Sequence, residues 1–347
     1  MIKFLHGADL HLDSPFSGLS PEEAAHRRSL QRQLPMALTA MANSRGCQLL
    51  LLAGDVFDGS PSPQTVQALQ EAFRAFRGRV FLAPGNHDPY TETSVWATQT
   101  WPDNVHIFGG GAQTVTLPDL GCRIWGGGFT ASHCRDGLPR VESEGFVEIG
   151  LFHGDAETDS PYRPISRQEI ADCGLDYLAL GHIHKRAMPR KVGATWYGWP
   201  GVTQGRGFDE TGKCGVFITE LDKHSCKTEF LAVDGPRYEV LYLPAGADPE
   251  TVIPADSENV IACLIRTGED DGTPLPDLKN RFYDLELRDE TVPIRDVWAD
   301  SGSQTLKGLA LTRLRTLYEE AKTESDRQKA HLAAQYVLAA LEGRDAP

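Results

Sequence analysis

The sequence lacks the features of a membrane or secreted protein. No apolar run among its 347 residues approaches the roughly 18 that a helix needs to cross a bilayer. The N-terminal segment has no basic stretch followed by a longer apolar one, so we expect no signal peptide. The seven cysteines are odd in number and widely spaced, without a CxxC pair, which argues against a disulfide framework or a zinc ribbon. We therefore expect a cytoplasmic protein with reduced thiols and no membrane partner.

Positive charge is also scarce. Thirty-four lysine and arginine residues stand against 48 aspartate and glutamate residues, and the formal net charge is −14. This balance counts against a nucleic-acid enzyme, because such enzymes usually present a basic surface to phosphates. The objection is weakened by carboxylates that hold cations, which the formal sum counts as negative. The charge is also uneven, since residues 241–347 carry −8 whereas residues 181–206 hold five basic and no acidic residues.

The first hundred residues alternate between strand-like and helical patterns. Apolar runs at 2–5, 48–53 and 80–83 are each followed by a helical pattern, at 21–44, 64–76 and 94–100. This order predicts a layered α/β architecture with buried sheets. From about Val105, short strands separated by glycine-rich turns predict a second sheet packed on the first.

The C-terminal third has a different pattern. Two strand candidates, at 259–266 and 282–287, follow a change of composition near residue 235, and two amphipathic helices follow Trp298. We expect three domains: a first domain over 1–235, a small α+β cap over 236–300 and a helical tail over 301–347.

Polar residues gather where the predicted strands end. The segments are DLH at 9–11, GDVFD at 54–58, GNHD at 85–88, HG at 153–154 and GHIH at 181–184. Such positions lie at the carboxyl edge of a sheet, where the ligand sites of α/β proteins form. In DLH and in the HIH of GHIH, an extended backbone would aim both polar side chains the same way.

These segments offer carboxylate, imidazole and amide groups but no thiolate. Oxygen and imidazole ligands suit Mn²⁺, Fe²⁺ or Zn²⁺. Two such ions need a shared carboxylate and can clamp the attacking and leaving oxygens of a phosphoryl group. A single one of these histidines is more simply interpreted as structural. Five segments in one order, each at a predicted strand end, favour a metal site.

The ordered segments resemble those of the calcineurin-like metallophosphoesterase superfamily. Three longer stretches are similar to bacterial DNA-repair exonucleases of the SbcD and YhaO type: ADLHLDSPF at 8–16, GDVFDGSP at 54–61 and GNHDP at 85–89. The resemblance covers about residues 1–230. It implies an α/β (α+β) fold, a four-layer αββα sandwich, which a small C-terminal α+β cap and a helical tail would follow.

The resemblance also implies two divalent ions, Mn²⁺ in the first place, with Fe, Zn or Mg as alternatives. The first ion would be held by Asp9, His11, Asp55 and His184, and the second by Asp55, Asn86, His153 and His182, with Asp55 bridging. His87 matches the acid that protonates or stabilises the leaving oxygen. Asp58 matches the carboxylate that orients this histidine, and Asp88 is the alternative for that role.

The implied function is two-metal hydrolysis of DNA phosphodiesters by an exonuclease, with endonuclease action as a second mode. A small-molecule phosphodiesterase or nucleotidase of the same superfamily is one alternative. Protein phosphatases fit less well, because they resemble GDYVDRG and GNHE where this chain has GDVFDGS and GNHD. The other alternative is a metal-bound scaffold without catalysis, against which the intact His87 and Asp58 argue.

Partners are indicated by two weaker features. Basic residues interleaved with aromatic ones suit a nucleic-acid strand, and a solvated edge over a packed core explains them equally well. The basic residues are Lys185, Arg186, Arg190, Lys191 and Arg206. The two C-terminal helices could dock on an SMC-like ATPase, or pack on each other or on the second domain. A homodimer is a further alternative.

Overall fold

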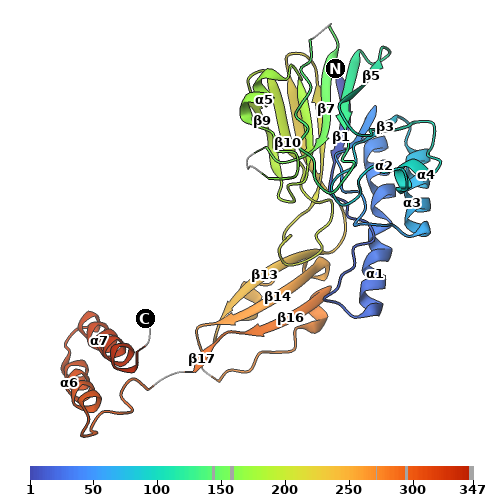
Figure 1. Ribbon diagram of the computed structural model, residues 1–347. Helices are drawn as coiled ribbons and strands as arrows, with labels where there is room; N and C mark the ends of the chain where they lie inside the picture. The colour runs from blue at the N-terminus through green and yellow to red at the C-terminus, as the bar shows by residue number, and fades with distance from the viewer. Residues whose placement is uncertain (143–144, 157–159, 271, 294–295, 344–347) are drawn as a thin grey trace. The chain divides into compact units, whose positions relative to one another are not determined.

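The computed structural model describes residues 1–142, 145–156, 160–270, 272–293 and 296–343. It contains two compact units (Figure 1). The first unit comprises Met1–Leu241, Ile253–Leu264 and Asp277–Glu286, and the second Tyr242–Val252, Ile265–Pro276 and Leu287–Pro347. The division into three domains at residues 235 and 300 stays a prediction, and residues 344–347 of the expected tail lie outside the described residues.

Two six-stranded sheets form the body of the first unit. The first sheet has the order β12 (Cys226–Ala232), β11 (Gly215–Leu221), β1 (Ile2–Gly7), β2 (Leu49–Leu52), β3 (Arg79–Leu82) and β4 (Val105–Ile107). The second has the order β5 (Gln113–Leu117), β6 (Cys122–Gly127), β7 (Val147–His153), β8 (Tyr177–Gly181), β10 (Thr195–Trp199) and β9 (Ala187–Val192). Strands β1 to β4 are parallel to one another, as are β6, β7, β8 and β10.

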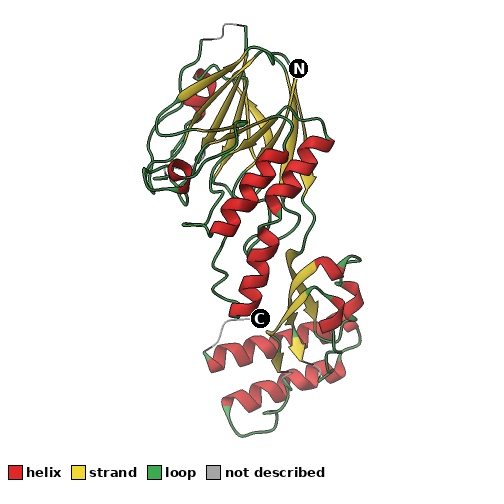
Figure 2. Ribbon diagram, turned by 90° about the vertical axis from the view of Figure 1, so that its right-hand side faces the viewer, coloured by secondary structure: helices red, strands yellow, loops and turns green. Residues whose placement is uncertain are grey.

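The two sheets pack face to face between helices, which confirms the predicted sandwich. Leu50 and Leu52 of β2 pack with the helices α2 (Leu34–Ser44) and α3 (Pro63–Ala75), whereas Leu49 and Leu51 pack toward the second sheet. Successive side chains of a strand point to opposite faces, so one apolar run serves both interfaces. The outer face of the second sheet is covered in part by the short helix α5 (Arg167–Asp172), whose Ile170 joins a third cluster. Figure 2 shows helices along the strands of this unit.

The helices of the first unit correct one prediction. The segment 21–44, expected as one helix, forms α1 (Pro21–Gln31) and α2 (Leu34–Ser44). Pro35 has no N–H to donate to the Gln31 carbonyl, and its ring would clash with that carbonyl. This explains the break between the two helices. The other helices are α3 (Pro63–Ala75), α4 (Val95–Thr98) and α5 (Arg167–Asp172). Helix α5 was not predicted, although a capping box of Ser166 and Glu169 marks its start.

The C-terminal third holds further small elements. A three-stranded sheet has the order β13 (Arg237–Pro244), β14 (Val260–Thr267) and β16 (Asp284–Asp289), and β15 (Glu269–Asp270) pairs with β17 (Val292–Pro293). Short 3₁₀ helices lie at Pro249–Thr251, Ser257–Asn259 and Lys279–Arg281. Strand β13 was not among the predicted strands.

The two predicted C-terminal helices are present as α6 (Leu306–Glu320) and α7 (Glu324–Glu342). They pack on each other through Leu311 and Ala334, together with Val297. Several of their apolar side chains remain exposed: Leu306, Leu309, Leu317, Leu332, Tyr336 and Leu341. In the described part of the chain, no helix is long and apolar enough to span a membrane.

Candidate metal centre

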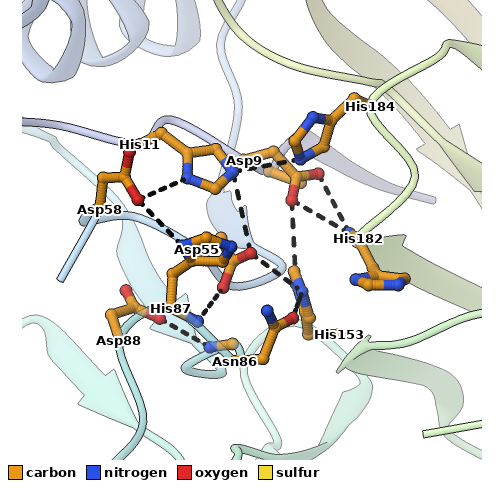
Figure 3. Close-up of polar contacts among 12 residues, drawn as sticks. Asp9, His11, Asp55, Asp58, Asn86, His87, Asp88, His153, His182 and His184 are labelled. Carbon is orange, nitrogen blue, oxygen red and sulfur yellow. Dashed lines mark hydrogen bonds and ion pairs between the residues drawn. The ribbon is translucent and has the colours of Figure 1, made fainter. Parts of the chain in front are cut away.

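The five polar segments meet at one end of the two sheets. They follow β1, β2 and β3, which are neighbours in the first sheet, and β7 and β8, which are neighbours in the second. Parallel neighbours end at the same edge, so these segments face one another across the sandwich. Figure 3 shows the resulting cluster of carboxylates and imidazoles.

The backbone of the cluster is unusual. Among the described residues, seven non-glycine residues have a positive φ, and four of these are candidate ligands: Asp9 (51°), His11 (45°), Asp55 (49°) and His182 (93°). The sequence argument that an extended backbone aims both side chains of DLH and HIH the same way is therefore wrong. These conformations cost of order 1–3 kcal/mol each, and such strain concentrates at functional sites. Bonds from Asp9 N to Gly54 O (3.0 Å) and from His11 N to Asp55 O (2.9 Å) hold the first two loops together.

Glycines before the ligands permit the close approach of these loops. A Cβ on Gly54, where φ is 85°, would overlap the His153 ring. A Cβ on Gly85 would overlap the Asp55 carboxylate. Gly54 is thus required by space and by conformation, and Gly85 is required by space.

One group of potential ligands consists of Asp9, His11 and His184, with ligand atoms within 4.8 Å of one another. His184 Nδ1 lies 2.7 Å from a carboxylate oxygen of Glu210, so this nitrogen carries the proton. The other nitrogen, Nε2, then directs its lone pair toward His11 Nε2, 3.2 Å away. Two facing imidazole nitrogens fit a shared cation.

A second group consists of Asp9, Asp55 and His153. His153 Nδ1 lies 2.9 Å from the Ala53 carbonyl, which can only accept, so this nitrogen carries the proton. Its Nε2 lies 2.9 Å from Asn86 Oδ1 and 3.3 Å from Asp55 Oδ2. Burial disfavours a charged ring, but the Asp55 and Asp9 carboxylates outweigh it and raise the pKa of His153 to about 9. The oxygens of Asn86 and Asp55 that converge on His153 Nε2 favour a positive charge at this point.

Asp55 belongs to the second group and also faces His11 of the first. Its Oδ2 is 3.8 Å from His11 Nε2 on one side and 3.3 Å from His153 Nε2 on the other. Asp9 and Asp55 are each 1% exposed. Within the described residues, neither forms an ion pair with lysine or arginine. Because a buried carboxylate needs an opposite charge, the donor set fits two divalent cations that share Asp55.

His182 departs from the expected ligand set. Its backbone N–H lies 3.1 Å from both oxygens of Asp9. Its ring lies beside the rings of His153 and Tyr162, with centroids 5.2 and 5.0 Å away. Within the described residues, it belongs to none of the groups that could hold a metal. The left-handed backbone of His182 explains why it and His184 do not point into one site.

His87 and Asp58 form a pair at the edge of the cluster. His87 Nδ1 lies 2.9 Å from Asp58 Oδ1, and the His87 side chain is 45% exposed. The hydrogen bond raises the pKa of His87. The nearby rings of His11, 3.8 Å away, and His87 hold the pKa of Asp58 far below its usual value. Asp88 instead accepts from the backbone N–H groups of Val56, Phe57 and Gly85. The structure therefore places Asp58, and not Asp88, against His87.

Arg206 and Glu210 complete this edge. Arg206 lies 3.4 Å from Asp58 Oδ2 and 3.4 Å from His184 Nδ1, and Glu210 binds its guanidinium at 2.7 and 3.2 Å. Glu210 was missed from the sequence because its link to His184 is formed by folding, and its only local signal is a spacing of four from Arg206. A partner of this kind fixes the orientation of a ligand histidine.

The other basic residues lie elsewhere. Arg190 and Lys191 belong to the edge strand β9, where their charged groups lie 5.0 Å from the Tyr197 ring and 5.6 Å from the Trp196 ring. Arg186 lies 3.9 Å from the Phe230 ring, and Lys185 lines a cavity whose wall also includes His184 and Glu210. Of the five predicted basic residues, only Arg206 contacts the pair formed by Asp58 and His87.

Comparison with known proteins places this centre in a family context. The family model described as calcineurin-like phosphoesterase matches residues 2–186. The chain is 31% identical over 266 residues to the uncharacterized metallophosphoesterase YhaO of Bacillus subtilis (strain 168). The match covers 71% of this chain and 63% of that protein, so it spans less than two thirds of the relative's length.

The solved structures that match this chain are less similar to it in sequence. The protein TT1561 of Thermus thermophilus is 14% identical with a TM-score of 0.42, over 67% of this chain and 99% of that chain. A novel archaeal phosphodiesterase is 15% identical with a TM-score of 0.37, over 66% of this chain and 100% of that chain. At this level, neither likeness bears on the substrate.

Proposed function

The chain belongs to the calcineurin-like phosphoesterase family, and within it we propose that the protein is a metal-dependent DNA nuclease. It would hydrolyse phosphodiester bonds in DNA repair or end processing, as an exonuclease first and an endonuclease second. The observation that carries the hydrolytic part of the proposal is the half-exposed His87, held by Asp58 beside a ligand cluster for two ions. This arrangement offers a proton to a leaving oxygen next to a bound phosphate.

Each residue of the centre has a role in this proposal. Bound divalent ions, Mn²⁺ in the first place, supply Lewis-acid polarisation of the phosphoryl oxygens and lower the pKa of water. One ion would be held by Asp9, His11, Asp55 and His184, and the other by Asp55, Asn86 and His153, with His182 completing the set on a change of its ring position. His87 donates its Nε2 proton to the leaving oxygen, and Asp58 holds the Nδ1 proton in place. Arg206 adds a positive charge at the edge where His87 lies.

Support for DNA over a small ester comes from the sequence. The stretches at 8–16, 54–61 and 85–89 resemble those of DNA-repair exonucleases of the SbcD type. A small-molecule phosphodiesterase or nucleotidase is the alternative, and it would use the same metal centre. The pairing of His87 with Asp58 argues against a scaffold that has lost catalysis, because a scaffold needs no leaving-group acid.

Partners and location are proposals of the same kind. The exposed apolar side chains of α6 and α7 would dock an SMC-like ATPase or a second copy of the chain. Lys185, Arg186, Arg190 and Lys191 would contact a longer DNA strand away from the centre. A protein that hydrolyses DNA would act in the cytoplasm, the location expected from the sequence.

The proposal is tested by a substrate panel in Mn²⁺. End-labelled DNA, cyclic nucleotides, mononucleotides and bis-p-nitrophenyl phosphate are compared for the parent chain and for His87→Ala. We expect DNA to be cleaved with the highest kcat/KM and the variant to lose turnover on it. Hydrolysis of nucleotides or small diesters with DNA left intact would refute the nuclease assignment and favour the small-molecule alternative.

A further inference from the structure

A cavity of about 400 Å³ opens beside the metal centre. Asp58 and Arg206 form part of its wall, and Phe16, Phe208 and Tyr238 form another part. Small-molecule sites commonly measure about 300–1,000 Å³ and are lined by aromatic groups with a few polar ones. The cavity thus joins the residues around the leaving-group acid to an aromatic surface.

The aromatic wall is held in place by neighbours outside the cavity. Tyr238 is 5% exposed, and its hydroxyl accepts a bond from Arg27 at 2.8 Å. The Arg27 guanidinium also lies 5.2 Å from the Tyr238 ring, and Phe208 packs edge-on against that ring at 5.1 Å. Phe208 itself remains partly exposed. The Phe208 ring, held by Tyr238 and partly exposed, is thus suited to stacking against a planar group.

Phe16 presents a second ring from the loop after β1. Its φ of 49° is rare for an aromatic residue, and the loop is closed by a bond from Leu19 N to Phe16 O of 3.0 Å. Strained backbone of this kind is retained where a function requires it. The loop follows directly on the candidate ligands Asp9 and His11, so the position of Phe16 is tied to the centre.

The charges of the cavity indicate what it can hold. Arg206 brings guanidinium N–H donors beside the centre, and it shares its charge with Glu210 at 2.7 Å and Asp58 at 3.4 Å. Besides Arg206, the described residues that line the cavity include no lysine or arginine to bind a second phosphate. An uncharged planar group needs no such cation.

We propose that this cavity binds the base of a nucleotide next to the scissile phosphate, stacked against Phe16 and Phe208, with Arg206 facing that phosphate. The inference rests on the proposed function and adds a base-binding subsite to it. Stacking on an aromatic residue is insensitive to sequence, because every base has a planar face. We therefore expect the protein to cleave a strand with a base at this position faster than a strand without one.

The test uses end-labelled oligonucleotides in which an abasic residue is placed in turn at each of the last few positions. The parent chain should cleave the intact strand faster than the strand abasic at one particular position, by roughly 5- to 150-fold, the range for one base–aromatic stack. In Phe208→Leu and Phe16→Leu, this ratio should fall toward one. Tyr242→Leu, which removes a 60% exposed aromatic residue outside the cavity, should keep the ratio of the parent.

Three results would overturn the inference. Equal cleavage of intact and abasic strands by the parent would show that no base is bound, while the nuclease assignment would survive. An unchanged ratio in both phenylalanine variants, with circular dichroism like that of the parent, would place the base elsewhere. Failure to cleave any DNA, with bis-p-nitrophenyl phosphate still hydrolysed, would remove the proposed function and the subsite with it.

Discussion

The buried His6 gives a pH dependence of stability that can be worked out from the structure. His6 is 0% exposed, and its two ring nitrogens lie 3.1 Å from the Tyr177 hydroxyl and 3.1 Å from the Leu180 carbonyl. The carbonyl can only accept, so Nε2 donates to it and Nδ1 accepts from Tyr177. The neutral ring thus links β1 to β8. Glutamine at this position can also donate and accept, but it carries no titratable group.

Burial lowers the pKa of His6 to about 3, with only partial opposition from the Leu180 bond. An unfolded histidine has a pKa of about 6.5, so between these values the unfolded chain binds more protons. Stability is therefore lost as pH falls below about 6.5, by about 1.4 kcal/mol per pH unit. At pH 5, His6 alone should lower the free energy of unfolding by about 2 kcal/mol relative to pH 7.

Urea unfolding of the parent and of His6→Gln, both with a chelator, at pH 7 and pH 5 measures this contribution. Other groups titrate in both chains and cancel in the comparison. On acidification the parent should lose about 2 kcal/mol more than the variant does. Equal losses would refute the claim that burial keeps His6 neutral.

Three further predictions concern the metal centre. His87→Ala should keep metal binding in calorimetry while turnover falls by about 10²–10⁴, and loss of metal uptake would make His87 a ligand. Glu210→Gln should weaken metal binding by about 10- to 100-fold, because His184 loses a charged partner; unchanged affinity would argue against this role. Gly54→Ala should lower metal affinity, since its Cβ would displace the His153 ring; calorimetry showing parental affinity would contradict this.

Much of the centre could be predicted from the sequence. A buried apolar strand followed by glycine and a polar residue predicts a position at a sheet edge, and Asp55 and Asn86 lie at such positions after β2 and β3. The positive φ values of Asp9, His11 and His182 could not be predicted, because they depend on bonds between loops far apart in sequence. The orientation of the His182 ring was missed for that reason.

Other differences have local causes that were visible in the sequence. Pro35 divides the expected helix, and the capping box marks α5. The basic stretch before Trp196 forms the edge strand β9, whose charged side chains lie over aromatic rings of the neighbouring strand.

Glu210, by contrast, belongs to no local sequence pattern for a metal centre. Only folding brings it to His184.

The stoichiometry of Mn²⁺ binding tests the central claim most directly. Calorimetric titration of the parent chain should show two ions, because Asp55, a member of one ligand group, also faces His11 of the other. Asp55→Asn removes the shared negative charge and should weaken both ions together. A parent chain that binds no more than one ion at saturation, or an Asp55→Asn variant that binds two ions with parental affinity, would contradict a two-metal centre bridged by Asp55.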